Sequence, residues 1–145
     1  LDFAGLPHRS EVVATVSGVT FINDSKGTNV AASVAALDGL KGPFVLIAGG
    51  QSKGADFRPL AASARGKLAA AVLIGEAAEK LEATLSSICP TRVADDLPAA
   101  VGLAWEFASA GTTILLSPAC ASLDMFTDYS ARGEAYIAAV QDLLQ

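Results

Sequence analysis

Apolar stretches of strand length recur along the chain, separated by longer segments of mixed polarity. Residues 44–50, 70–75 and 112–118 are apolar runs closed by glycine or proline, which predicts strands buried on both faces. Residues 91–94 predict a further, shorter strand. Strands of this kind occur in parallel sheets that carry helices on both faces.

The segments between these strands have their apolar residues at helical spacing. Val30, Val34 and Leu37 are separated by four and three positions, so we expect a helix here that ends near Gly39. Further helices are expected after Asp56 with Pro59 in the first turn, over 76–86, after an Asp96 cap with Val101, Trp105 and Ala108 on one face, and through Gly133, Ile137, Val140 and Leu144.

The beginning of the chain predicts a β-hairpin. Residues 11–16 and 19–24 are rich in apolar residues, and Ser17-Gly18 between them is a two-residue turn signal. The fold class that follows is α/β. We expect a Rossmann-like, mostly parallel six-stranded sheet with one antiparallel edge strand and helices on both faces.

Length and composition predict one domain that packs against something else. The chain has 145 residues, which suits a single core, and 17% of them are charged against about 25% in a typical domain. We therefore expect part of its surface to be covered by a neighbouring domain. Because the chain begins with Leu1 rather than methionine, we interpret it as part of a longer protein. Residues 1–10 are then an interdomain linker or entry segment, and 11–145 are the domain.

Charge and cysteine content exclude several classes of protein. A net charge of −5 without any basic run argues against nucleic acid or an anionic membrane as partner. The longest apolar run, 68–74, is too short for a membrane helix of about 20 residues. Cys89 and Cys120 lack CxxC or histidine spacing, which argues against a disulfide framework or a metal site. We expect a cytoplasmic monomer with reduced thiols.

Polar residues gather where three predicted strands lead into helices, at 24–29, 49–57 and 117–133. These corners follow the carboxyl ends of parallel strands, where α/β sheets bind their ligands, so we expect them side by side. In the first corner, a helix starting near Thr28 would point free N–H groups at a ligand, and Lys26 would add a positive charge. The alternative is structural: Ser25 or Thr28 caps the helix, Asp24 accepts hydrogen bonds, and Lys26 is solvated.

The second and third corners leave similar alternatives open. Lys53 either binds a ligand or is a solvated lysine in a glycine turn. The chain lacks the P-loop motif GxxxxGK[ST], and no dinucleotide-binding motif GxGxxG follows a strand. Two lysines at one edge of an acidic chain suit a ligand with several carboxylates or phosphates. In the third corner, small residues are expected to let the backbone approach a ligand, with Ser122 and the following N–H groups as donors. Cys120 is not predicted to be a nucleophile, because the sole histidine, His8, has no motif linking it to the cysteine.

Four motifs, in this order, together resemble one family. They are GLPHR-E, NDSKGTN, the apolar strand that ends in GG followed by K-x-x-DF, and LLSPACASLDMF-x-x-Y-x-x-RG. The chain resembles the C-terminal domain of the Mur ligases over nearly its whole length. The combination of DSK-x-TN with SPACAS is typical of the branch that adds D-glutamate.

The resemblance implies an ATP-dependent ligase of peptidoglycan biosynthesis. In that branch, ATP phosphorylates the terminal carboxylate of UDP-N-acetylmuramoyl-L-alanine, and the amine of D-glutamate attacks the acyl phosphate. ATP and Mg²⁺ are held mainly by a central domain, and the UDP sugar by an N-terminal one, so this chain alone is expected to be inactive. The C-terminal domain binds D-glutamate and closes over the nucleotide.

The resemblance also implies roles for individual residues. Thr28, Lys53 and Ser122 are expected to hold the two carboxylates of D-glutamate, assisted by the backbone N–H of Tyr129, where relatives usually have phenylalanine. The residues expected to reach the nucleotide are Arg9 and Asp24, and Lys26 is expected to be catalytic, beside the transferring phosphate.

Two other readings remain open on the sequence. The chain could be a Rossmann-type nucleotide- or metabolite-binding regulatory module without chemistry, which micromolar dinucleotide binding would reveal. It could also belong to a ligase of the same fold that adds a different amino acid, which a screen of amino acids on the complete enzyme would reveal.

Overall fold

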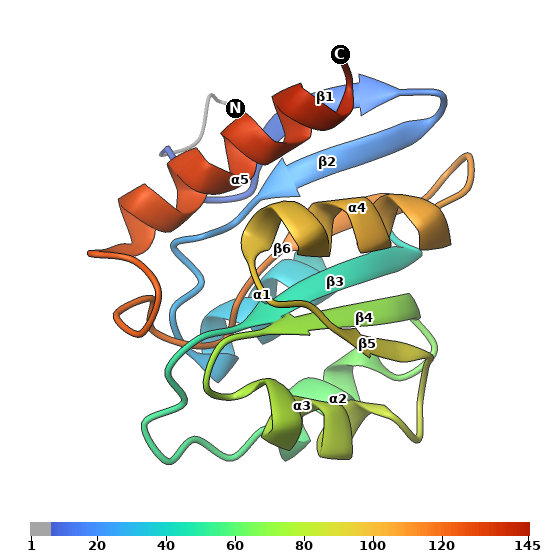
Figure 1. Ribbon diagram of the computed structural model, residues 1–145. Helices are drawn as coiled ribbons and strands as arrows, with labels where there is room; N and C mark the ends of the chain where they lie inside the picture. The colour runs from blue at the N-terminus through green and yellow to red at the C-terminus, as the bar shows by residue number, and fades with distance from the viewer. Residues whose placement is uncertain (1–6) are drawn as a thin grey trace.

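Strands and helices follow one another in the predicted order within residues 7–145, the part of the chain that this computed structural model describes (Figure 1). In chain order the elements are β1 (Glu11–Val16), β2 (Val19–Asn23), α1 (Val30–Gly39), β3 (Phe44–Gly49), α2 (Arg58–Ala64), β4 (Leu68–Ile74), α3 (Ala78–Leu85), β5 (Thr91–Val93), α4 (Leu97–Phe107), β6 (Thr113–Leu116) and α5 (Tyr129–Leu143). The predicted linker covers residues 1–10, and residues 1–6 of it lie outside the described part of the chain.

The strands form one six-stranded sheet in the order β1-β2-β6-β3-β4-β5. β1 pairs with β2 antiparallel at one edge, and all other pairs are parallel. The predicted fold class is therefore confirmed, including the antiparallel edge strand that the opening hairpin supplies. No helix within residues 7–145 has the length and apolar character needed to cross a membrane.

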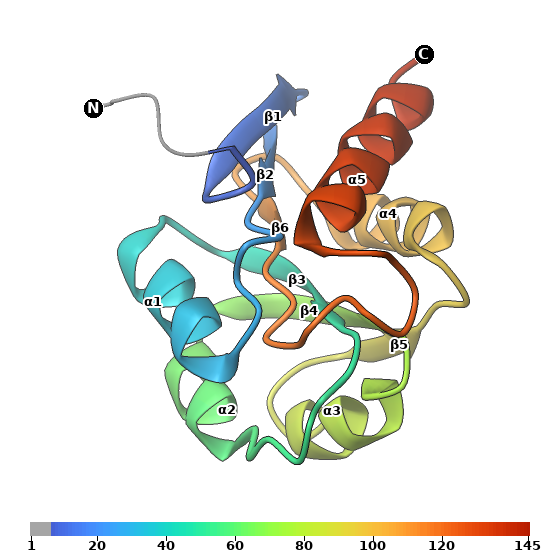
Figure 2. The same ribbon diagram turned by 90° about the vertical axis from the view of Figure 1, so that its left-hand side faces the viewer.

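Helices cover both faces of the sheet, and side chains of the central strands alternate between the two layers. Along β3, Phe44, Leu46 and Ala48 pack with α1, α2 and α3, whereas Val45 and Ile47 pack with α4 and α5. All five are buried, which explains why this strand is a continuous apolar run in the sequence. Figure 2 shows α1, α2 and α3 on one side of the sheet and α4 with α5 on the other.

Helix α1 begins later than predicted, and Thr28 does not cap it. The side chain of Asn29 accepts a hydrogen bond from the backbone N–H of Ala32 at 2.9 Å and is the N-cap. The backbone N–H of Thr28 instead donates to the carbonyl of Lys26 at 2.8 Å, in a tight turn before the helix. Asparagine is among the best capping residues, so it takes this role from the neighbouring threonine. The Thr28 hydroxyl is then available for another partner.

The buried stripe of α5 also differs from the predicted one. Gly133, Tyr136 and Val140 are buried, whereas Ile137 is only partly buried and Leu144, beyond the helix end, is 37% exposed. Tyr136 can replace an aliphatic residue in the core because its hydroxyl donates to the carbonyl of Ile114 at 3.1 Å. Hydrophobicity alone does not reveal that this polar atom has a partner.

The connections after β2, β3 and β6 meet at the edge of the sheet that is formed by the carboxyl ends of these strands. This edge faces the viewer in Figure 2. β6 lies between β2 and β3. The helix that follows β6 is on one face, and the helices that follow β2 and β3 are on the other. Connections that diverge to opposite faces open a crevice at the carboxyl ends of the strands, where sheets of this class bind ligands.

Two glycines allow close packing at this edge. Gly49 and Gly50 both have a φ of +132°, a backbone conformation open to glycine and strained for other residues. A Cβ atom on Gly49 would overlap the carbonyl oxygen of Ile74, and one on Gly50 would overlap that of Ala121. Gly49, the last residue of β3, therefore allows close contact with the end of β4, and Gly50 lets the third corner lie directly against the second.

Candidate functional site

The three polar corners lie side by side, as the sequence predicted, and backbone hydrogen bonds hold them together. The N–H of Asp24 donates to the carbonyl of Leu116 at 2.7 Å, and the N–H of Ala119 donates to that of Gly27 at 3.0 Å. On the other side, Gln51 and Ala121 form an antiparallel bridge. The corner that follows β6 thus lies between the other two and contacts both.

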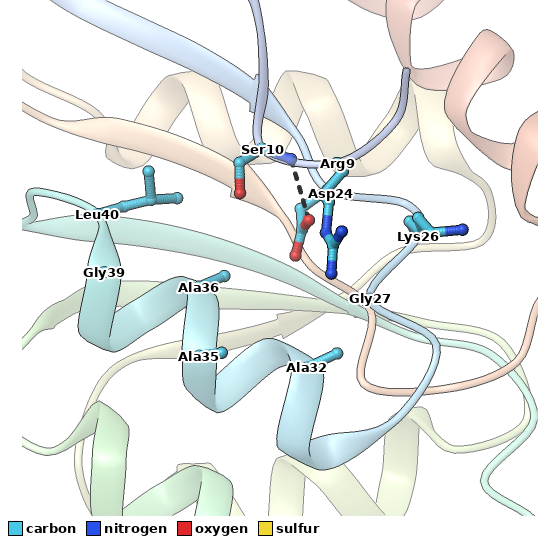
Figure 3. A pocket seen from close by; sticks show the side chains of 10 residues that line it. All are labelled: Arg9, Ser10, Asp24, Lys26, Gly27, Ala32, Ala35, Ala36, Gly39 and Leu40. Carbon is cyan, nitrogen blue, oxygen red and sulfur yellow. Dashed lines mark hydrogen bonds between the residues drawn. The ribbon is translucent and has the colours of Figure 1, made fainter. Parts of the chain in front are cut away.

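A cavity of about 340 Å³ opens beside the first corner (Figure 3). Its polar end contains Arg9, Asp24 and Lys26, and its other end follows small residues of α1. The remaining lining residues are Ser10, Gly27, Ala32, Ala35, Ala36, Gly39 and Leu40. Arg9 and Asp24 extend into the cavity towards α1 in Figure 3. The two residues predicted to reach a nucleotide therefore line one cavity, together with the predicted catalytic lysine.

Asp24 is only 5% exposed, and both of its carboxylate oxygens accept hydrogen bonds. The backbone N–H of Ser10 donates to Oδ1 at 3.0 Å, and the hydroxyl of Ser117 donates to Oδ2 at 2.8 Å. Burial raises the pKa of Asp24 above its ordinary value, although the hydrogen bonds from Ser117 and Ser10 and the charge of Arg9 oppose this effect. A carboxylate in this setting gains from further donors, such as the hydroxyl groups of a ligand.

A second cavity, of about 250 Å³, lies between the first and second corners. Thr28 and Lys53 both line it, so the structure brings together two of the four residues predicted to bind D-glutamate. The other lining residues are Asn29, Val30, Gln51, Ser52, Ala55, Ala119 and Ala121. None of the lining residues is acidic, and Lys53 carries their only charge. The cavity is therefore suited to an anion.

Lys53 has an uncommon backbone conformation. Its φ is +51°, and that of the following Gly54 is +73°. Left-handed conformations outside glycine are often found at functional sites. The loop is held farther along by Lys80, whose ammonium donates to the carbonyl of Ala55 and lies 5.3 Å from the ring centroid of Phe57. The exposed side chain of Lys53 thus projects from a loop that is anchored to α3.

Lys26 contacts α5 rather than the floor of the first cavity. Its Nζ donates to the hydroxyl of Tyr129 at 3.2 Å and lies 4.7 Å from the centroid of that ring. In Figure 3 its side chain points away from Arg9 and Asp24. The side chain is half-buried, so the alternative of a freely solvated lysine is wrong.

The other two residues predicted to bind D-glutamate lie outside the second cavity. Ser122 is 4% exposed, and its carbonyl accepts from the N–H groups of Met125 and Phe126. Tyr129 is the first residue of α5, which Asp128 caps by accepting from the N–H of Ala131 at 2.8 Å. The backbone N–H of Tyr129 therefore belongs to a helix start, where anions are favoured.

The sequence reading gave Arg132 no role, yet this arginine connects the first and third corners. Only 1% of it is exposed. Its Nε and Nη2 donate to the hydroxyl and carbonyl of Ser25 at 3.0 and 2.8 Å, and its Nη1 donates to the carbonyl of Cys120 at 3.0 Å. Burial lowers its pKa to about 10, so it remains charged at neutral pH. The sequence offered one signal for this role, an arginine next to a glycine in the first turns of the last helix.

His8 is the second residue whose role the sequence did not reveal. It is 7% exposed and lies against Gly133 of α5. Its Nδ1 lies 2.9 Å from Nδ2 of Asn23, which can only donate, and its Nε2 lies 3.4 Å from Oε1 of Glu134. Its carbonyl accepts from the N–H of Lys26 at 2.9 Å. His8 thereby fixes the segment that carries Arg9 to the sheet.

Cys120 is not placed to act as a nucleophile. The side chain is 1% exposed, and burial raises the pKa of its thiol to about 12, so the thiolate is scarce at neutral pH. Within residues 7–145, no three histidine, cysteine or acidic side chains come together in a way that could hold a metal ion.

Comparison with known proteins agrees with the resemblance. Residues 8–120 match the family described as Mur ligase, glutamate ligase domain. The UDP-N-acetylmuramoylalanine--D-glutamate ligase of Legionella pneumophila (strain Lens) is 48% identical over 145 residues, covering 97% of this chain and 32% of that protein. The ligase of the same name from Aromatoleum aromaticum is 54% identical over 143 residues, covering 97% and 31%. The chain thus spans about a third of the length of these relatives.

A solved structure gives the same fold. The bifunctional folylpolyglutamate synthase/dihydrofolate synthase of Yersinia pestis, complexed with AMPPNP and Mn ion, superposes with a TM-score of 0.67 at 19% identity. The match covers 97% of this chain and 33% of that one, and at this identity it shows the fold alone. Because the family match extends over most of the sequence, from His8 to Cys120, the chain belongs to the Mur ligase family, as its glutamate ligase domain.

Proposed function

We propose that this domain binds D-glutamate and the nucleotide in an ATP-dependent ligase that joins D-glutamate to UDP-N-acetylmuramoyl-L-alanine during peptidoglycan biosynthesis. The observation that carries the proposal is the pair of cavities at one edge of the sheet. One contains Arg9, Asp24 and Lys26, and the other contains Thr28 and Lys53 without any acidic residue. The names of relatives that are 48% and 54% identical support the choice of substrate.

In this proposal the second cavity holds one end of the amino acid, which extends from there towards Ser122 and the start of α5. Lys53 binds one carboxylate of D-glutamate as an ion pair, and the hydroxyl of Thr28 donates to the same ligand. Ser122 and the backbone N–H of Tyr129 receive the other carboxylate at the start of α5. Anchoring both carboxylates leaves one enantiomer with its amine directed at the acyl phosphate, which gives the preference for the D form.

The first cavity faces the nucleotide. The guanidinium of Arg9 fits a phosphate group, and the carboxylate of Asp24 can accept hydrogen bonds from ribose hydroxyls. Lys26 stabilises negative charge on the transferred phosphate as the amine attacks and the phosphate departs. The contact of its ammonium with Tyr129 supports this role, because it holds the ammonium beside the start of α5, where the proposed carboxylate site lies.

ATP fits the cations of this edge, whereas Mg²⁺ needs more oxygen ligands than the residues lining the first cavity supply. Mg²⁺ prefers several oxygen ligands, and Asp24 is the single acidic residue that lines the first cavity. We therefore assign the metal, and the UDP sugar, to the two thirds of the protein that this chain does not cover. Both cysteines of the described part are free and buried, and this supports the proposal of a cytoplasmic protein with reduced thiols. We also propose that the protein acts as a monomer.

The test is a screen of amino acids with the full-length protein. With ATP, Mg²⁺ and UDP-N-acetylmuramoyl-L-alanine present, D-glutamate is expected to give phosphate release and a product heavier by one glutamyl residue. L-Glutamate and D-aspartate are the matched controls, and both are expected to react far more slowly. A better rate with another amino acid would indicate a related ligase of different specificity. Nucleotide binding without amino-acid-dependent turnover would indicate a regulatory module.

Replacing Arg9 by alanine tests whether the two cavities bind different substrates. The KM for ATP is expected to rise about 10-fold, as for the loss of one hydrogen bond to a charged group, while the KM for D-glutamate stays unchanged. Arg58 is exposed, pairs with Asp56 and lines neither cavity, so Arg58→Ala is the control and should leave both values unchanged. A selective rise in the KM for D-glutamate would contradict the assignment of Arg9 to the nucleotide.

A further inference from the structure

The contact between Lys26 and Tyr129 joins two corners through their side chains. The ammonium of Lys26 donates to the phenol oxygen at 3.2 Å and lies 4.7 Å from the ring centroid, so both the hydroxyl and the π face hold it. We propose that the hydroxyl of Tyr129 is a positioning group, which keeps the ammonium of Lys26 at the start of α5 for the transfer reaction. This inference rests on the proposed function, because it assumes that Lys26 acts on the transferred phosphate.

Both ends of this contact are fixed by backbone. On the Tyr129 side, its carbonyl accepts from the hydroxyl of Ser25 at 2.7 Å, and Arg132 donates to the same hydroxyl at 3.0 Å. On the Lys26 side, its N–H donates to the carbonyl of His8 at 2.9 Å. The ring of His8 meets that of Tyr129 edge-on, at 6.3 Å between centroids. The backbone at both ends is therefore fixed, and the long side chain of Lys26 is the flexible part of the contact. Its ammonium is held by the phenol of Tyr129.

The chemistry of the pair gives the hydroxyl a second use. A phenol oxygen that accepts from an ammonium still has its own O–H to donate, and the ammonium has further N–H groups. Accepting from a cation also polarises the O–H, which strengthens it as a donor. Lys26 and Tyr129 can therefore donate side by side to one anion, of the phosphate or carboxylate class. Phenylalanine at this position would keep the ring contact and lose both effects of the hydroxyl.

The experiment compares the chain's two tyrosines, which both lie on α5. In the full-length enzyme, Tyr129→Phe is expected to lower kcat about 3- to 10-fold, the fold-change expected for a partly exposed hydrogen bond to a charged group, with unchanged KM for ATP and unchanged Tm. Tyr136→Phe removes a buried hydroxyl that donates to Ile114, so it should lower Tm and leave kcat unchanged. Tyr129→Leu, which also loses the ring, should lower kcat further than Tyr129→Phe.

A double-mutant cycle with Lys26→Met shows whether the hydroxyl acts through the lysine. Radiolabelled D-glutamate keeps slow variants measurable. Tyr129→Phe is expected to have no further effect on kcat when Lys26 is already methionine. An equal loss in both backgrounds, or a kcat unchanged by Tyr129→Phe while Lys26→Met is impaired, overturns the inference and leaves the proposed function standing. A kcat unchanged by Lys26→Met overturns the inference and the proposed role of Lys26 together.

Discussion

Replacing Arg132 by methionine is expected to lower the free energy of unfolding by about 2–4 kcal/mol, since each buried partner left without its hydrogen bond costs about 1–3 kcal/mol. Methionine keeps much of the length and apolar volume of the side chain but donates nothing. The carbonyls of Ser25 and Cys120 and the hydroxyl of Ser25 would all lose a donor in a buried setting. Removing the buried charge also removes its desolvation penalty. The expected loss of stability is therefore smaller than the sum of the penalties for the three lost hydrogen bonds.

Urea unfolding followed by circular dichroism measures the effect. Arg65 is an exposed arginine at the end of α2, and Arg65→Met is the matched control, with an expected change within about 0.5 kcal/mol. Arg132→Lys retains a charge but cannot reproduce the fork of donors, so its stability should lie between those of the parent and Arg132→Met. If Arg132→Met is as stable as the Arg65 variant, the guanidinium does not hold the two corners together.

Lys53→Ala in the full-length enzyme is expected to raise the KM for D-glutamate about 10- to 100-fold, because a hydrogen bond to a charged group contributes about 1.5–3 kcal/mol. The KM for ATP should not change, since Lys53 lines the second cavity and is not among the residues that line the first. Lys53→Met retains the apolar stem and should behave like the alanine variant. The charge is then the property that binds the substrate.

Steady-state kinetics with each substrate varied in turn separates these outcomes. Lys41, an exposed lysine between α1 and β3, offers a control in which charge is lost at the opposite edge of the sheet. Lys41→Ala should leave both KM values unchanged. A KM for D-glutamate that stays within about threefold of the parent in either Lys53 variant would show that Lys53 is a solvated loop lysine. It would also remove the basis for placing a carboxylate in the second cavity.

The sequence by itself determined the order and class of the elements. Strands such as β3 and β6 are buried on both faces, so their apolar runs identify them without any knowledge of their neighbours. The Ser17-Gly18 turn likewise predicts the hairpin that provides the antiparallel edge strand. Because carboxyl ends of parallel strands meet at one edge, the sequence also placed Lys26, Thr28 and Lys53 near one another, whereas Arg9 was assigned to the site through the family resemblance alone.

Only the tertiary structure decided how side chains at this edge pair with one another. The contact of Lys26 with Tyr129 and the two bonds of Arg132 to Ser25 join residues more than a hundred positions apart, which no local spacing predicts. The stripe of α5 differed for the same reason, because the hydroxyl of Tyr136 finds its acceptor on β6. Strand and helix patterns follow from local backbone geometry and burial, whereas the partner of a polar atom depends on which distant segment folds against it.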